Sequence, residues 1–152
     1  MVGVNHNIGI IGFGGMARFH YSYLTENNYE RAKFKGVFDI NPEACKVAQK
    51  RGISKIYSSK EEMFADPEID LITIATTNDA HKDLSIEAMR AGKNVLCEKP
   101  VTLSSEDLLE IMEVAKETGK VFSINQNNVF GRCVGSGKNW KRLAFFSFVN
   151  NE

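Results

Sequence analysis

The feature that most constrains this chain is a glycine-rich turn near its amino terminus. An apolar run at residues 8–11 is followed at once by Gly12-Phe13-Gly14-Gly15-Met16-Ala17. Apolar or aromatic residues then recur at helical spacing, at Met16, Phe19, Tyr23 and Leu24. A buried strand, a glycine turn and a helix form the context in which G-x-G-x-x-G/A indicates a dinucleotide-binding turn. The motif by itself also fits a methyltransferase or a plain strand-to-helix corner, so its meaning depends on the rest of the chain.

The small residues of this turn have steric reasons. Gly12 allows the tight turn, Gly14 lets the backbone approach a pyrophosphate because no Cβ intervenes, and Ala17 allows the helix to pack closely on the sheet. The start of the helix adds unpaired N–H groups and a partial positive charge, which favour phosphate. The cofactor contacts predicted in this turn are Gly12, Phe13, Gly14, Gly15 and Met16.

An acidic residue stands where the ribose of such a cofactor needs one. A second apolar run, residues 34–38, ends in Asp39, which lies 25 positions after Gly14. An acid about 20 residues beyond the glycines is the expected partner of the ribose hydroxyls. The alternative is a turn or helix-capping aspartate, but Asn41-Pro42 already supplies a cap and a first-turn proline. The next residue is Ile40 and not an arginine that would receive a 2′-phosphate, so NAD is favoured over NADP.

Strands and helices alternate along the whole chain, with short connections. Strands are predicted at residues 8–11, 34–38, 53–57, 70–75, 94–97 and 121–124. This alternation predicts an α/β fold, a doubly wound six-stranded parallel sheet of the Rossmann type with strand order 3-2-1-4-5-6. Ligands of such sheets bind at the carboxyl ends of the strands. The predicted site residues all follow strand ends, including Thr76, Thr77, Asn78, Glu98 and Lys99.

Lys99 follows the fifth predicted strand, between Glu98 and Pro100. A loop lysine is ordinarily a solvated surface charge. At this position, however, its ammonium would lie beside the reactive end of a bound cofactor and would stabilise the changing charge on a substrate oxygen. We expect Glu98 to hold the lysine in place and Pro100 to fix the turn, with a cis bond as one form of it.

Three stretches of the sequence resemble one known family. They are residues 10–20, Thr76-Thr-Asn-Asp-Ala-His81, and the highly specific run Ala91-Gly-Lys-Asn-Val-Leu-Cys-Glu-Lys-Pro100. Together they resemble the glucose–fructose oxidoreductase, inositol dehydrogenase and rhizopine-catabolism (Gfo/Idh/MocA) family, over roughly residues 7–127. The resemblance implies an NAD(P)-dependent oxidoreductase that acts on sugars, polyols or related hydroxy compounds.

The resemblance also assigns roles to single residues. Lys99 matches the catalytic lysine of the family, and Thr76 and Asn78 match the loop that touches the nicotinamide ribose. Thr77 stands where the family usually has proline. His81 fits the loop histidine of the family and so a cofactor contact, but a scaffold role at the start of a helix is favoured for it. His20 is expected to be a packing residue.

The end of the chain departs from the family pattern. Residues 1–125 form the predicted dinucleotide-binding domain, and residues 126–152 form an atypical tail. The family's second α+β domain, which supplies the substrate pocket, a partner acid/base histidine and most of the oligomer interface, has no counterpart here. Two interpretations therefore compete: the coenzyme domain of an oxidoreductase, and a dinucleotide-binding module or truncated product without turnover. A homo-oligomer is compatible with both.

Composition narrows the partners and the compartment. The formal net charge is zero, so neither nucleic acid nor an anionic membrane is an expected partner. No apolar run approaches the roughly 20 residues of a membrane helix, and the first residues lack the pattern of a secretory signal. Three cysteines without C-x-x-C spacing indicate thiols in a reducing cytoplasm. The expected ligand is a small-molecule sugar or polyol, and no metal site is predicted.

Overall fold

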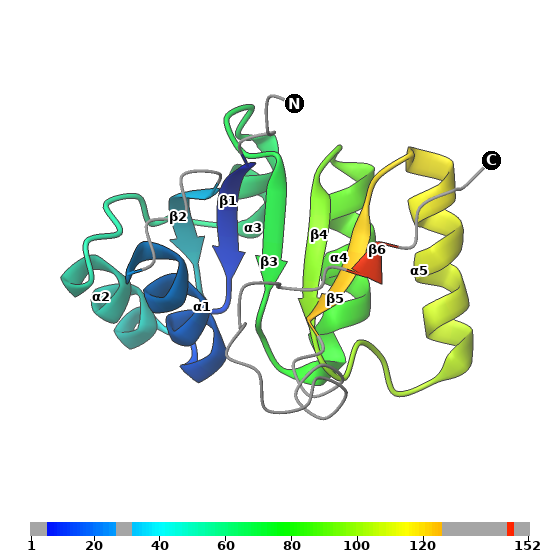
Figure 1. Cartoon of the computed structure of the whole chain (residues 1–152), viewed down its shortest axis with the longest axis horizontal. Helices are drawn as coiled ribbons and strands as arrows, with labels where there is room; N and C mark the ends of the chain where they lie inside the picture. Colours follow the sequence, from blue (N-terminus) through cyan, green and yellow to red (C-terminus); the bar gives the residue numbers. More distant parts are fainter. Residues whose placement is uncertain (1–5, 27–31, 126–145, 148–152) are drawn as a thin grey trace, which may run out of the picture.

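The computed structural model of the chain describes residues 6–26, 32–125 and 146–147. Its centre is a six-stranded sheet in the order β2-β1-β3-β4-β5-β6 (Figure 1). The strands are β1 (His6–Ile11), β2 (Ala32–Phe38), β3 (Leu71–Ile74), β4 (Asn94–Glu98), β5 (Phe122–Asn125) and β6 (Phe146–Ser147). The first five pair in parallel, which confirms the predicted doubly wound α/β fold.

Helices connect the strands and cover both faces of the sheet. They are α1 (Gly15–Glu26), α2 (Pro42–Lys50), α3 (Lys60–Ala65), α4 (His81–Arg90) and α5 (Ser105–Thr118), with the short 3-10 helix η1 (Asn78–Ala80) before α4. Side-chain caps begin three of them. Asn41, Ser59 and Ser104 each accept a hydrogen bond from a backbone N–H two or three residues further along, which satisfies one of the unpaired donors at each helix start.

Two apolar clusters show how the layers divide. The first joins buried residues of α1 and α2 to one face of β1 and β2, as in Ala17 with Ile10. The second joins α3, α4 and α5 to the opposite face, as in Ile111 with Ile72. Alternate residues of one strand serve the two clusters, because successive side chains of a strand point to opposite faces.

The predicted third strand is reduced to a single parallel bridge between Val37 and Ile56. The amide of Val37 donates to Lys55 O over 3.0 Å, and that of Tyr57 donates to Val37 O over 2.9 Å. The residues on either side of this bridge have other conformations or hydrogen-bonding partners, so the strand does not extend. Gly52 takes a positive φ of 92° after α2, and the amide of Ser58 donates to Glu62 of α3. The bridge still lies on the outer side of β2, so the predicted strand order is correct and only the length of this strand was wrong.

The sixth predicted strand, residues 121–124, is observed as β5. Beyond it the two residues of β6 pair in antiparallel fashion, Ser123 with Ser147 and Ile124 with Phe146, which the sequence pattern did not predict. Apart from this pair, the predicted tail at residues 126–152 lies outside the described residues. The domain boundary at residue 125 stays a prediction.

The inward face of α1 differs from the predicted one. Ala17 is fully buried, and Tyr21 and Leu24 pack on the same cluster. Met16 is 37% exposed and Phe19 is 58% exposed. Because α1 begins directly at the glycine turn, its closest approach to the sheet falls at the small residue Ala17. The inward face is therefore centred on Ala17 and leaves Phe19 outside.

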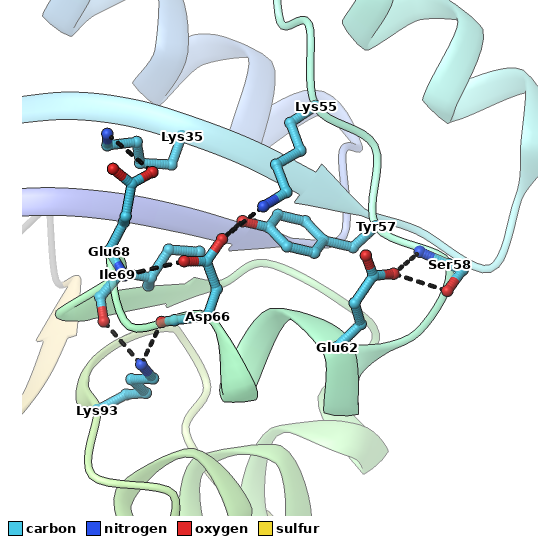
Figure 2. A network of polar contacts seen from close by, with 9 residues as sticks. All are labelled: Lys35, Lys55, Tyr57, Ser58, Glu62, Asp66, Glu68, Ile69 and Lys93. Atoms are coloured by element: carbon cyan, nitrogen blue, oxygen red, sulfur yellow. Dashed lines mark hydrogen bonds and ion pairs between the residues drawn. The ribbon is translucent and has the colours of Figure 1, made fainter.

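At the edge where β3 begins, a polar network joins three segments (Figure 2). Asp66 Oδ2 accepts hydrogen bonds from Lys55 Nζ and from the Tyr57 hydroxyl, each over 2.6 Å. These bonds hold the pKa of Asp66 well below its usual value, while burial and then the bond to Asp66 raise the pKa of Tyr57 to about 12. The ammonium of Lys93, itself 7% exposed, donates to the carbonyls of Asp66 and Ile69. The network anchors the turn that leads into β3.

Candidate functional site

The carboxyl ends of the parallel strands meet at one edge of the sheet, the lower edge in Figure 1. The turn after β1, Asp39 after β2, Thr76 after β3 and Glu98 at the end of β4 all lie there. Hydrogen bonds and close contacts join these segments to one another, so the structure brings the predicted residues together at one edge.

Gly12 is required at its position by sterics. Its φ is 84°, and an added Cβ would lie 2.7 Å from Ala75 O and 2.9 Å from Thr76 Cγ2. Its amide donates to Phe38 O over 2.8 Å. The turn after β1 is thus packed against the end of β3 and bonded to the end of β2. A larger residue would need both a strained backbone and a displaced neighbour.

The outer side of the same turn is open. Gly14 and Gly15 are exposed, and a Cβ added to either would meet nothing within 4 Å. Helix α1 begins at Gly15 and has no acidic residue in its first turn. The arrangement fits an anion above the turn, because the first N–H groups of a helix point outward and carry partial positive charge. Phe13, by contrast, is fully buried, and its backbone already makes two hydrogen bonds: the amide donates to Asp39 and the carbonyl accepts from Arg18 Nε.

The carboxylate of Asp39 is fixed beside this turn. Oδ2 accepts from the amide of Phe13 over 2.6 Å, and Oδ1 accepts from the amide of Asn41 over 2.7 Å. The side-chain cap of α2 is Asn41, whose Oδ1 accepts from Glu43 N. Asp39 is therefore not the helix cap, but its bond from the amide two residues further along is the turn role given above as the alternative. Its neighbour Ile40 is 91% exposed and presents an apolar side chain beside the carboxylate.

The segment after β3 leads from the turn toward the lysine. Thr76 is half-buried, and Thr77 and Asn78 are exposed where η1 begins. Thr77 occupies the N-cap position of η1 without a side-chain capping bond. Thr76 lies close to the glycine turn, since a Cβ added to Gly12 would come within 2.9 Å of Thr76 Cγ2.

His81 links the segments that follow β3 and β4. It is 1% exposed. Its Nδ1 lies 2.8 Å from Pro100 O, and its Nε2 lies 3.3 Å from Thr76 O. With both ring nitrogens facing backbone carbonyls, His81 has the geometry of the scaffold role. The peptide bond between Lys99 and Pro100 is cis, as predicted for one form of this turn.

The Glu98 side chain is bonded to the backbone amide of Lys99 and not to the Lys99 side chain. The Lys99 amide donates to Glu98 Oε2 over 3.3 Å. Glu98 Oε1 lies 2.9 Å from His20 Nε2 and 2.6 Å from Asn125 Nδ2. Glu98 is 4% exposed. Burial raises the pKa of its carboxyl, but the hydrogen bonds from His20 and Asn125 outweigh burial and leave that pKa lowered.

His20 and Asn125 are site residues that sequence reasoning missed. His20 was expected only to pack, yet it pairs with Glu98. Asn125 ends β5 and so occupies the same place on its strand as Glu98 does on β4. Its position at the carboxyl end of a predicted strand could have identified Asn125 from the sequence, because polar residues at the carboxyl ends of neighbouring parallel strands meet at one edge.

Lys99 itself is exposed. Within the part of the chain that the structure describes, its Nζ has no ion-pair or hydrogen-bonding partner. In the same part, no group of three or more His, Cys, Asp or Glu residues is arranged to hold a metal ion. There, too, no helix has the length and apolar character that crossing a membrane requires.

Comparisons with known proteins agree with this geometry. Residues 6–126 match the model of the Gfo/Idh/MocA proteins, an oxidoreductase family with an NAD-binding Rossmann fold. The chain is 34% identical over 151 residues to scyllo-inositol 2-dehydrogenase (NAD(+)) of Bacillus subtilis strain 168, covering 94% of this chain and 44% of that protein.

Two solved structures share the fold. An NAD-binding protein from Listeria innocua superimposes with a TM-score of 0.78 at 44% identity, covering 83% of this chain and 36% of that one. The WlbA dehydrogenase from Chromobacterium violaceum, solved with NADH and UDP-GlcNAcA, superimposes with a TM-score of 0.75 at 30% identity, covering 82% and 36%. The chain thus spans less than half of the length of each of these three relatives.

Proposed function

The chain belongs to the Gfo/Idh/MocA oxidoreductase family, and from that membership we propose that it binds NAD(H) across the carboxyl edge of its sheet. The reaction proposed for this site is hydride transfer to or from a sugar, polyol or related hydroxy compound. The observation that carries the proposal is the contact between the Phe13 amide and Asp39 beside the open Gly14 and Gly15. Open space above Gly14 and Gly15 beside a fixed carboxylate supports the binding of a pyrophosphate and a ribose there.

The adenosine half of the cofactor would be held by the first two strands. Gly14, Gly15 and the start of α1 receive the pyrophosphate, and Met16 lies at the same helix start. Asp39 accepts hydrogen bonds from the ribose hydroxyls. A 2′-phosphate would place further negative charge against Asp39, and Ile40 offers it no cation. NAD is therefore the proposed cofactor, and NADP the less favoured one.

The nicotinamide half would lie toward β3 and β4. When bound, the nicotinamide supplies or accepts the hydride. Thr76 and Asn78 contact its ribose, and His81 holds the loops on which they and Lys99 stand. Lys99 contacts the nicotinamide end of the cofactor. Its ammonium also donates a hydrogen bond to the reacting oxygen of the substrate and stabilises the negative charge that develops there.

A second candidate function is a dinucleotide-binding module without turnover. The observation that favours it is that Lys99 is exposed and its Nζ has no ion-pair or hydrogen-bonding partner among the described residues. The cofactor site proposed here is the same under both candidates. They differ only in whether a substrate is held against Lys99.

Binding of NADH to the purified chain tests the proposal. Titration followed by nicotinamide fluorescence is expected to give saturable binding, and ADP-ribose is expected to compete because it carries the pyrophosphate and the adenosine ribose. His6→Leu, at the start of β1 and far from this edge, is a control that leaves binding unchanged. An absence of binding at millimolar NADH, with a folded circular dichroism spectrum, would refute the proposed site.

A further inference from the structure

We propose that His20 is a positioning residue for Lys99 and acts on it through Glu98. The inference rests on the proposed function, since it concerns the lysine assigned to the reactive end of the cofactor. It adds a residue that neither the glycine motif nor the lysine motif contains. His20 lies on the same helix, α1, whose first turn is proposed to bind the pyrophosphate.

Three elements that are distant in sequence bring these side chains together. His20 comes from α1, Glu98 from the end of β4 and Asn125 from the end of β5. The side chains of His20 and Glu98 are 11% and 5% exposed. The contact between Asn125 and His20 spans 105 positions of the chain. A buried polar cluster assembled from three elements is costly unless its groups satisfy one another.

The hydrogen bonds of the cluster converge on one carboxylate oxygen. Glu98 Oε1 faces both His20 Nε2 and Asn125 Nδ2. An ionised carboxylate only accepts, so both nitrogens are assigned as its donors. Asn125 Nδ2 also lies 2.6 Å from His20 Nε2, and under this assignment that contact is between two donors and is not a hydrogen bond. Nδ1 of His20 is buried and has no hydrogen-bonding partner among the described residues. The proton of His20 is therefore assigned to Nε2, because a buried N–H without an acceptor is more costly than a buried lone pair.

With Oε1 held in this way, the other oxygen is directed at the lysine. Glu98 Oε2 accepts from the Lys99 amide. The next residue, Pro100, is held through its carbonyl by His81. The backbone around Lys99 is thus held by two buried side chains, Glu98 at its amide and His81 at the next carbonyl. The Lys99 side chain has no hydrogen-bonding partner among the described residues. Removing the His20 side chain takes away one of the two donors to Glu98 Oε1 and leaves β4 and β5, which carry Glu98 and Asn125, unchanged.

The experiment compares His20→Leu, which keeps apolar bulk, with His20→Gln, which restores an N–H donor. His6→Leu is the matched histidine control. Each is titrated with NADH and with ADP-ribose, which lacks the nicotinamide. His20→Leu is expected to weaken NADH binding by about three- to tenfold, the loss of one charge-assisted hydrogen bond transmitted to one end of the ligand. ADP-ribose affinity is expected to stay within about twofold, and His20→Gln to recover most of the loss.

A double-mutant cycle with Lys99→Ala tests the route of the effect. If His20 acts through Lys99, the double variant loses no more NADH affinity than Lys99→Ala alone. Additive losses would overturn the inference. Equal losses for NADH and ADP-ribose, or no loss at all, would also overturn it and would leave the proposed function intact.

A measurement without cofactor tests the positioning role of His20 separately from the proposed NAD(H) binding. In amide hydrogen exchange followed by NMR, the Lys99 amide is expected to exchange about tenfold faster in His20→Leu than in the wild type, while the amide of Ile74 in β3 is unchanged. His20→Gln should stay close to the wild type. An unchanged Lys99 amide in a folded His20→Leu variant refutes the positioning role. If the wild type binds neither ligand, the proposed function fails and the amide still decides whether His20 positions Lys99.

Discussion

The amide of Phe13 donates a hydrogen bond to Asp39 Oδ2 across 2.6 Å, and this bond joins the glycine turn to the carboxyl end of β2. The two predicted halves of an adenosine site are therefore joined by the chain's own atoms. A carboxylate that is already fixed loses little conformational entropy on binding, which favours affinity.

The first prediction concerns the charge at this contact. Asp39→Ala is expected to weaken NADH binding by roughly 1.5–3 kcal/mol, about ten- to a hundredfold, because hydrogen bonds from the ribose hydroxyls to a charged acceptor are lost. Fluorescence titration measures the loss. Glu113→Gln, an exposed change on α5, is the control and should bind as the wild type does. An Asp39→Ala variant with unchanged affinity would remove the proposed role of Asp39.

The second prediction concerns the choice of cofactor. NADPH is expected to bind at least about tenfold more weakly than NADH, since its 2′-phosphate would lie against the carboxylate of Asp39. The double variant Asp39→Ser with Ile40→Arg should narrow or reverse the preference, because it removes the repulsion and adds a guanidinium. Competition titrations give both ratios. Tighter binding of NADPH by the wild type would mean that another cation reaches the phosphate.

The third prediction separates stability from binding with two glycines of one turn. Gly12→Ala is expected to lower the free energy of unfolding by about 2 kcal/mol or more, because the residue has a left-handed φ and its Cβ would press on Ala75 O. Gly14→Ala has open space and should change stability by less than about 0.5 kcal/mol. The same Cβ of Gly14→Ala should weaken NADH binding by about tenfold or more, since it enters the proposed pyrophosphate space.

Thermal or urea unfolding and NADH titration together check this pair. A Gly14→Ala variant that is stable and binds normally would move the pyrophosphate away from Gly14. A Gly12→Ala variant as stable as the wild type would show that the turn can relax away from β3.

Much of this site follows from sequence pattern alone. The glycine turn, Asp39 and Lys99 each stand directly after an apolar run, and parallel strands bring such positions to one edge by topology. The prediction needed only the type of each element and the direction of each strand. Errors of a residue or two at element ends did not affect it.

The parts that were missed depend on tertiary contacts that no local pattern encodes. The inward face of α1 is set by how closely Ala17 approaches the sheet, not by the spacing of the larger apolar residues. The cluster of His20, Glu98 and Asn125 joins residues 27 and 105 positions apart. The predicted length of the third strand was wrong because the residues on either side of it form a positive-φ turn and the start of α3, which leaves room for one bridge.

The fourth prediction concerns acid stability and the network of Figure 2. The folded-state pKa of Asp66 lies below its usual value of 3.8, so Asp66 stabilises the fold above that value. This contribution is lost as the pH falls below about 4 toward the folded-state pKa. Asp66→Asn is expected to cost roughly 1–2 kcal/mol at pH 7, through the bonds to Lys55 and Tyr57, and to flatten the decline of stability with acid.

Urea unfolding at several pH values between 2 and 7 measures both effects, with the exposed change Glu113→Gln as the control. An Asp66→Asn variant whose stability falls with acid as steeply as that of the wild type would assign the acid sensitivity to another carboxyl group.

The last prediction separates an enzyme from a binding module. We expect the 152-residue chain to bind NADH and yet to turn over no sugar or polyol at a measurable rate with NAD. The described residues place Lys99 on one exposed edge, and a substrate must also be held at near-attack distance from the nicotinamide. Correct orientation can supply about 7–11 kcal/mol of the barrier, and a positioned acid or base contributes about 10²–10⁴ in rate.

A panel of sugars and polyols with NAD, followed by absorbance of NADH, tests this expectation. Turnover by the wild type that disappears in Lys99→Ala would refute the expectation and identify Lys99 as a catalytic residue of this chain. If the chain binds NADH but turns over none of the sugars and polyols, the result favours a dinucleotide-binding module.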